Sequence, residues 1–198
     1  SLMLLRRNDR VVFLGDSITE QQLYTNYVES YLSGRYPDLN LTFYNAGWGG
    51  DTAPGGFARL ERDVLSLKPG VVTLCYGMND ASYTHPTAEI KDRFVAGMES
   101  LLGALKKRRI RVALLTPGFG DVKANPNLAK VDYNRKGLRV LADTVLKIAK
   151  ARRLPVCDIH RLMTQCDERG KRRERSFNLA PDGFHPSPPG QLVMAFGL

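Results

Sequence analysis

Cysteine is scarce in this chain of 198 residues, which contains three: Cys75, Cys157 and Cys166. Their odd number and their spacing match neither a set of paired disulfides nor the ligands of a metal site. Cys75 and Cys157 stand in apolar runs, where a free cysteine behaves as a small hydrophobic residue. The sequence therefore predicts no disulfide framework and no metal centre, and places these two thiols in the core.

Long hydrophobic runs are also missing, so no segment is long enough to cross a bilayer. The apolar stretch at the N-terminus, residues 2–5, is too short for a signal peptide and precedes the charged residues. We expect a chain that is either cytoplasmic or exported with its signal already removed. A Gly-x-Gly-x-x-Gly or Walker-type phosphate loop is absent as well, which argues against a nucleotide-binding protein.

Positive charge is in excess, with a formal net charge of +9 at pH 7. Two clusters, residues 106–111 and 169–175, carry much of it. Neither contains interleaved aromatic residues, and the first lies where a helix is expected to end, a position that favours cations. A surface for nucleic acid or another anionic polymer is the alternative, but we expect solvated faces and no nucleic-acid partner.

Five short apolar runs alternate with helical patterns along the chain. The runs cover residues 11–14, 41–44, 71–75, 112–115 and 154–157, and helical spacing falls in 21–34, 57–67, 90–105 and 128–148. This alternation predicts an α/β fold whose five-stranded parallel sheet has helices on both faces. The last run contains Pro155 and is expected at an edge of the sheet. The loops that follow parallel strands share one rim, and polar residues gather in these loops.

A candidate nucleophile, Ser17, stands at this rim directly after the first apolar run. Serine at the end of a buried strand can react if a base reaches it, or it can merely cap the next helix. His185 is a candidate base because Asp182 precedes it by three residues, and Gly183 permits a turn that brings the carboxylate to the ring. A loop histidine beside an ordinary Asp-Gly turn is the alternative interpretation. Asp16 is expected to support the turn or to cap the following helix.

Serine-based acyl transfer also needs donors for an oxyanion, and the next two loops offer them. Gly50 lies in a glycine-rich turn where a backbone N–H can approach a ligand closely. Asn79 follows the third run, and its side-chain amide is a suitable donor, although asparagine is also common in turns. With the N–H of Ser17, the sequence predicts three donors on one rim.

Four segments in this order resemble the motifs of the GDSL/SGNH hydrolase family of serine esterases and lipases. They are residues 15–19, 45–52, 77–80 and 182–186. The resemblance implies a three-layer α/β/α, flavodoxin-like fold. It also implies a triad of Ser17, His185 and Asp182, and an oxyanion hole formed by Ser17, Gly50 and Asn79.

The activity implied by this resemblance is that of a carboxylic ester hydrolase that needs no metal and no organic cofactor. Its substrate would be a small-molecule or carbohydrate ester, of the short-chain, O-acetyl carbohydrate or lysophospholipid type. The alternative is a non-catalytic module that binds a carbohydrate or an anionic glycan in the same pocket.

Several residues beside the motifs are candidates for the wall of a substrate pocket, with ordinary packing as the alternative. Glu20 departs from the family pattern, which often has glycine there, and its carboxylate could shape the pocket or simply start a helix. The other candidates are Trp48, Tyr76, Met78 and Phe184.

The length of the chain fits one domain over residues 1–198. A final helix is expected from Pro189-Gly190 to Leu198, about two turns and shorter than the usual ~11–12 residues. Either the chain is a fragment of a longer polypeptide or this helix packs through a neighbour. The oligomeric state is left open.

Overall fold

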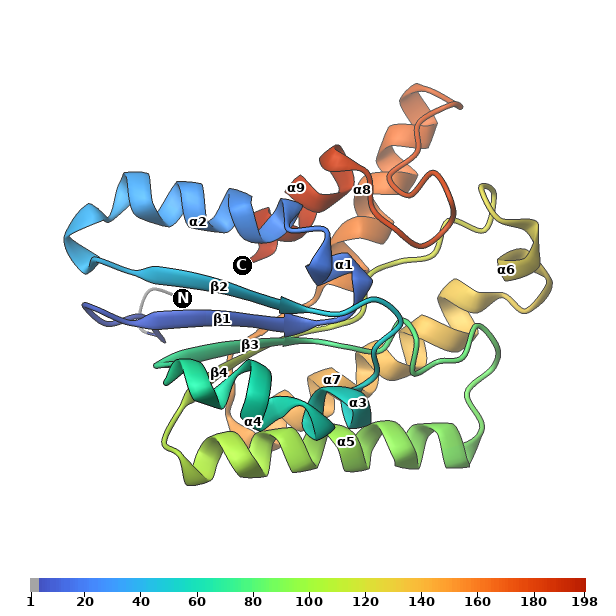
Figure 1. Cartoon of the computed structure of the whole chain (residues 1–198). Helices are drawn as coiled ribbons and strands as arrows, with labels where there is room; N and C mark the ends of the chain where they lie inside the picture. The colour runs from blue at the N-terminus through green and yellow to red at the C-terminus, as the bar shows by residue number, and fades with distance from the viewer. Residues whose placement is uncertain (1–3) are drawn as a thin grey trace.

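The computed structural model describes residues 4–198 and is built around one five-stranded parallel sheet (Figure 1). The strand order is β2-β1-β3-β4-β5, so the first strand along the chain lies inside the sheet. The strands are β1 Arg10–Gly15, β2 Thr42–Gly47, β3 Val71–Cys75, β4 Arg111–Leu115 and β5 Val156–Cys157. β5 lies at an edge, as its proline-containing sequence predicted.

Helices cover both faces of this sheet (Figure 1). One layer contains α2 Leu23–Arg35, α8 Ile159–Arg173 and α9 Pro188–Gly197; the other contains α3 Ala53–Ala58, α4 Leu60–Asp63, α5 Ala88–Lys107 and α7 Arg139–Arg152. The short helices α1 Ser17–Glu20 and α6 Pro126–Lys130 lie beyond the carboxyl ends of the strands. The predicted α/β class with a parallel sheet is therefore confirmed.

Strand register brings the polar loops to the same rim. Gly15, the last residue of β1, pairs with Gly47 on one side and with Cys75 on the other. These residues are also the last of β2 and β3, so the three strands end level. The loops that follow them must therefore start beside one another.

Buried apolar side chains explain why the sheet and α5 stay together. All five residues of β3 are buried, as a strand covered on both faces requires. In α5, Phe94, Met98, Leu101 and Leu105 face the core at helical spacing. Thr87 caps this helix by accepting a hydrogen bond from the N–H of Ile90 at 3.2 Å.

Two helices expected to be continuous are broken, and one was not predicted. The segment 57–67 consists of the end of α3, α4 and a 3₁₀ turn at Leu65–Leu67, and Phe57 is exposed instead of buried. The segment 128–148 is divided into α6, a π-helical turn at Tyr133–Leu138, and α7. Helical spacing reports which residues share a buried face, and short helices in series can share one face without forming one helix. Helix α8 was not predicted because it is strongly charged and contains few apolar residues.

The two basic clusters lie at the ends of α5 and α8. Lys106 and Lys107 are in the last turn of α5, and Lys171 to Arg173 are in the last turn of α8. Cations there face the negative end of the helix dipole. No helix among residues 4–198 has the length and apolar character needed to cross a membrane.

Helix α9 packs against α2 and α8 and begins one residue before the predicted start. The side-chain amide of Gln191 donates to the carbonyl of Ile18 at 3.2 Å and accepts from the N–H of Tyr24 at 3.1 Å. This buried residue joins α9 to the segment that presents Ser17. That residues 1–198 form a single domain stays a prediction.

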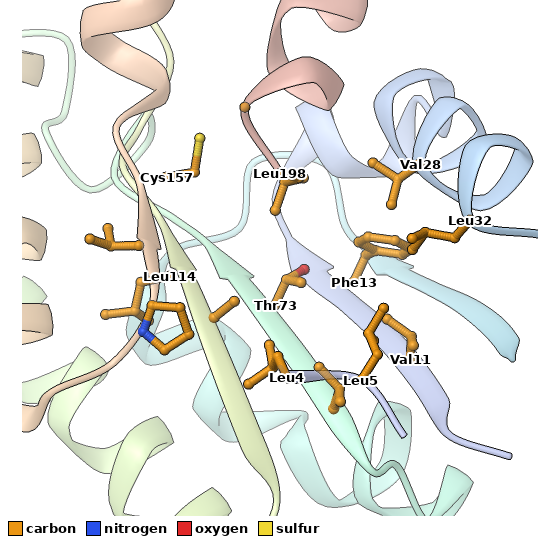
Figure 2. A pocket seen from close by; sticks show the side chains of 15 residues that line it. Leu4, Leu5, Val11, Phe13, Val28, Leu32, Thr73, Leu114, Cys157 and Leu198 are labelled. Atoms are coloured by element: carbon orange, nitrogen blue, oxygen red, sulfur yellow. The ribbon is translucent and has the colours of Figure 1, made fainter. Parts of the chain in front are cut away.

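A small apolar cavity of about 130 Å³ lies between the sheet, α2 and the end of α9 (Figure 2). Leu5, Phe13, Val28 and Leu198 are among its lining residues. The hydroxyl of Thr73 also lines it, and this buried oxygen has no hydrogen-bond partner among the described residues. The cavity is separate from the rim that carries Ser17.

Candidate active site

The turn from β1 into α1 determines where the Ser17 side chain lies. Asp16 is the N-cap of α1, and its Oδ1 accepts a hydrogen bond from the N–H of Ile18 at 3.0 Å. Ser17 is thereby the first residue of the helix, at the carboxyl end of a central strand. The capping role expected for Asp16 is confirmed.

Asp16 is almost fully buried, which has an electrostatic consequence. Burial raises the pKa of its carboxyl group to about 7, with a further contribution from the nearby carboxylate of Asp80 and an opposing one from the Ile18 N–H. The same cause raises the pKa of Asp80 to about 6. Both buried carboxyl groups therefore ionise at a higher pH than an ordinary aspartate does.

Ser17 and His185 meet although 168 positions separate them. The Oγ of Ser17 lies 2.9 Å from the Nε2 of His185, and the Nδ1 of His185 lies 2.7 Å from the Oδ2 of Asp182. When Nδ1–H donates to the carboxylate, the lone pair of Nε2 faces the serine hydroxyl. The three side chains that the sequence singled out thus form one hydrogen-bonded chain.

The loop of residues 182–185 holds the Asp182 carboxylate on the ring. Gly183 has a φ of +99°, a conformation that glycine adopts without a steric penalty. The Oδ1 of Asp182 accepts hydrogen bonds from the N–H groups of Phe184 and His185 at 2.9 and 2.8 Å. Partial burial would raise the pKa of Asp182, but these N–H groups and the His185 side chain outweigh it and lower the pKa. The carboxylate is therefore ionised at neutral pH.

The three candidate oxyanion donors lie on the same rim. Gly50 has a φ of +73°, and within residues 4–198 neither its N–H nor that of Ser17 has a hydrogen-bond acceptor. The Nδ2 of Asn79 donates to the carbonyl of Asp51 at 2.9 Å. Because Asp51 directly follows Gly50, this hydrogen bond connects the loop after β2 to the loop after β3.

Arg59 connects the ends of β1 and β2 to the loop that follows β2. This residue was not identified from the sequence. Its guanidinium, with a side chain only 9% exposed, pairs with Asp51 at 2.8 Å and with Asp63 at 3.2 Å. The Nη2 of Arg59 also donates hydrogen bonds to the carbonyls of Gly15 and Ala46 at 3.0 and 2.8 Å. The ends of β1 and β2 and the loop after β2 are thereby joined by one side chain. Neither spacing nor composition marks this arginine in the sequence, because most arginines are exposed to solvent.

The candidate pocket residues divide into two groups. Glu20 and Trp48 are exposed, and Phe184 is partly exposed with its ring edge-to-face on His185 at a centroid distance of 5.8 Å. Tyr76 and Met78 are buried, 1% and 3% exposed, so these two predictions were wrong. Both follow the fully buried strand β3, and their side chains extend its core.

Tyr76 has a structural position instead. Its hydroxyl donates to Asp51 Oδ2 at 2.9 Å and accepts from Arg59 at 3.1 Å.

No group of three or more His, Cys, Asp and Glu side chains in the described part of the chain is arranged to hold a metal ion.

Comparison with known proteins gives the family. The model of the GDSL-like Lipase/Acylhydrolase family matches residues 13–193, and the chain belongs to this family. Its class is that of the carboxylic ester hydrolases.

The relatives include an acetylxylan esterase from Geobacillus stearothermophilus, which is 26% identical over 98% of this chain and 93% of its own. A crystal structure of a catalytic mutant of an acetylxylan esterase from that organism has a TM-score of 0.76 at 25% identity, covering 98% of this chain and 94% of that one. A gut microbial diltiazem-metabolizing enzyme has a TM-score of 0.77 at 24% identity. The present chain is covered to 98% but spans only 46% of that enzyme, and the likeness is one of fold.

Proposed function

We propose that this ester hydrolase uses Ser17 as its nucleophile, His185 as its general base and Asp182 as the carboxylate that orients the base. The observation that supports this most directly is the chain of two hydrogen bonds, 2.9 and 2.7 Å long, that joins the three side chains. A serine hydroxyl is a weak nucleophile unless a base removes its proton as it attacks. The 2.9 Å distance between the Ser17 Oγ and the His185 Nε2 supports the role of His185 as this base.

In the proposed mechanism, the Oγ of Ser17 attacks the ester carbonyl while its proton passes to the Nε2 of His185. The N–H groups of Ser17 and Gly50 and the Nδ2 of Asn79 stabilise the charge on the carbonyl oxygen. His185 then gives the proton to the departing alcohol as the C–O bond breaks. Water attacks the acyl-serine with the same base, and the carboxylic acid leaves. The ionised Asp182 stabilises the imidazolium during both steps.

For the substrate we propose an O-acetylated carbohydrate, with other short-chain esters as weaker substrates. Support comes from the acetylxylan esterases, which match this chain over nearly its whole length. Exposed Trp48 lies on the loop between Gly47 and Gly50, where it could contact a sugar ring. Glycan binding without turnover is the alternative that the following experiment excludes or supports.

The test compares wild type, Ser17→Ala and the control Ser33→Ala, which alters an exposed serine of α2. The substrates are p-nitrophenyl acetate and octanoate and an acetylated xylo-oligosaccharide, with released p-nitrophenol or acetate measured. We expect the acetyl esters to be hydrolysed faster than the octanoate, an S17A rate lower by about 10³-fold or more, and an unaltered S33A. Activity that survives in S17A refutes the mechanism. Oligosaccharide binding without acetate release by the wild type supports the glycan-binding alternative.

A further inference from the structure

Tyr83 contacts Asn79 but belongs neither to the proposed triad nor to the proposed oxyanion donors. Its hydroxyl donates a hydrogen bond to the Oδ1 of Asn79 at 2.7 Å. We propose that Tyr83 is a positioning residue that orients the Asn79 amide for oxyanion binding. This inference rests on the proposed function, because Asn79 is an oxyanion donor only if Ser17 is the nucleophile.

The Asn79 amide is held at both ends. Its Oδ1 accepts from Tyr83, and one Nδ2 hydrogen is donated to the carbonyl of Asp51. A rotation of 180° about the last side-chain bond would place the amide oxygen against the Asp51 carbonyl, so that bond would be lost, and the Tyr83 hydroxyl would have to change from donor to acceptor. The second Nδ2 hydrogen is thereby kept available to an oxyanion. A donor on Oδ1 also polarises the amide, which makes its N–H a stronger donor.

The ring of Tyr83 is braced by two aromatic neighbours. It stacks on Tyr133 at a centroid distance of 5.5 Å and meets Phe184 edge-to-face at 5.2 Å. The Tyr133 hydroxyl in turn donates to the carbonyl of Met78, the residue before Asn79. Phe184 is the neighbour of His185. The Tyr83 ring therefore stands between the loop that carries the proposed oxyanion donor and the loop that carries the proposed base.

The backbone at Tyr83 is held in a costly conformation. Ser82 and Tyr83 both have a φ of +54°, in the left-handed region that residues with a side chain seldom adopt consecutively. Such strain persists where surrounding contacts over-determine it. The hydroxyl bond and the two ring contacts fix this conformation together with the backbone hydrogen bond from the Ser82 N–H to the Asn79 carbonyl at 2.9 Å.

The hydroxyl is protonated over the pH range in which an esterase is assayed. Partial burial, together with the nearby carboxyl groups of Asp16 and Asp182, raises the pKa of the Tyr83 phenol above its ordinary value, although the residue is 41% exposed. Tyr83 is thus a stable donor, and the Asn79 oxygen is its acceptor.

The decisive substitution is Tyr83→Phe, which removes the hydroxyl and keeps the ring. Its matched control is Tyr31→Phe, which alters an exposed tyrosine of α2 in an edge-to-face pair with Tyr36, far from the rim. We expect Y83F to lower kcat on p-nitrophenyl acetate by about 5- to 10-fold, as loss of one hydrogen bond would, with KM within about twofold. Y31F is expected to match the wild type.

Coupling to Asn79 distinguishes an oriented amide from a merely structural ring. In an N79A background, Y83F is expected to change kcat by less than about twofold, since the group it orients is gone. An equal loss in both backgrounds overturns the proposal, and so does an unchanged kcat in the single variant. Phenylboronic acid, which forms a tetrahedral adduct with a nucleophilic serine, gives a second readout. Its Ki should rise in Y83F by the same factor as kcat falls, and an unchanged Ki overturns the proposal.

The outcomes for Tyr83 and for the proposed function are separable. Loss of activity in S17A together with an unaltered Y83F refutes only the role of Tyr83. Activity retained in S17A refutes the proposed nucleophile, whatever Y83F does.

Discussion

Replacement of Arg59 by methionine is the perturbation with the largest expected effect outside the three hydrogen-bonded side chains. Methionine retains an unbranched apolar stem of similar reach but has no guanidinium. The variant loses hydrogen bonds to Asp51, to Asp63, to the Tyr76 oxygen and to two strand-end carbonyls. The carboxylate of Asp51, whose side chain is 8% exposed, then stays buried without its positive partner.

The expected cost follows from this uncompensated charge. Breaking a buried ion pair by removing one partner costs about 3–5 kcal/mol, a large part of the ~5–15 kcal/mol by which a domain is stable. Substituting Asn for Asp51 in the same chain removes the orphaned charge and retains an oxygen acceptor for the Tyr76 hydroxyl. The double variant R59M/D51N should therefore be more stable than R59M alone.

Activity should fall together with stability, because Arg59 joins the strand ends that carry the proposed oxyanion donors. We expect kcat on p-nitrophenyl acetate to drop by about 10- to 100-fold, since the donors are displaced but not removed. Urea unfolding followed by circular dichroism at 15 °C measures stability, and initial rates at the same temperature measure kcat.

Arg62→Met is the matched control, because this arginine also pairs with Asp63 but is exposed. Its unfolding midpoint and kcat should stay at the wild-type values. The reasoning is refuted if R59M unfolds at the wild-type urea midpoint, or if R59M/D51N is less stable than R59M.

Two further predictions concern buried polar groups. Thr73→Val should raise the free energy of unfolding by about 1–2 kcal/mol in urea melts, because it replaces a buried hydroxyl that has no partner within residues 4–198 by a methyl group of similar size. The control Thr25→Val, whose hydroxyl donates to a carbonyl at 2.9 Å, should be destabilising, and a T73V loss would contradict the prediction. Asp16 has a pKa of about 7 in the folded state, against an ordinary value of 3.8. Between these two pH values the folded state binds more protons than the unfolded state, so the free energy of unfolding falls as the pH rises through this range. Asp16→Asn removes this term and should be more stable than the wild type at pH 8, by up to about 4 kcal/mol, with the difference vanishing near pH 4. A constant difference across thermal melts at pH 4, 6 and 8 would refute the assignment.

Local features of the site could be predicted from the sequence because their interactions span few residues. Asp16 caps the helix through the N–H two positions later, and Asp182 binds groups two and three positions later. Apolar runs likewise predict the buried strands. The two broken helices show the limit of this reasoning, since the pattern identified their buried residues but not where the backbone turns.

Other features depend on tertiary structure. Tyr76 resembled a pocket residue by its place beside a motif, yet its ring lies in the core. Arg59 belongs to no motif in the sequence, yet four carboxyl and carbonyl groups surround its guanidinium. Only the packing of the segments decides which of these environments a side chain enters.

The sequence by itself determined the α/β class, the loops that carry the polar residues and the family motifs. It did so because apolar periodicity, capping and tight turns arise between neighbours along the chain. Tertiary structure alone decided that Ser17 and His185, 168 positions apart, lie within a hydrogen bond of each other. That distance depends on the strand order, on the level ends of β1, β2 and β3, and on α9, whose Gln191 holds the Ser17 segment in place. Contacts of this kind are selected by the packing of the whole fold, because each is too distant along the chain to be favoured locally.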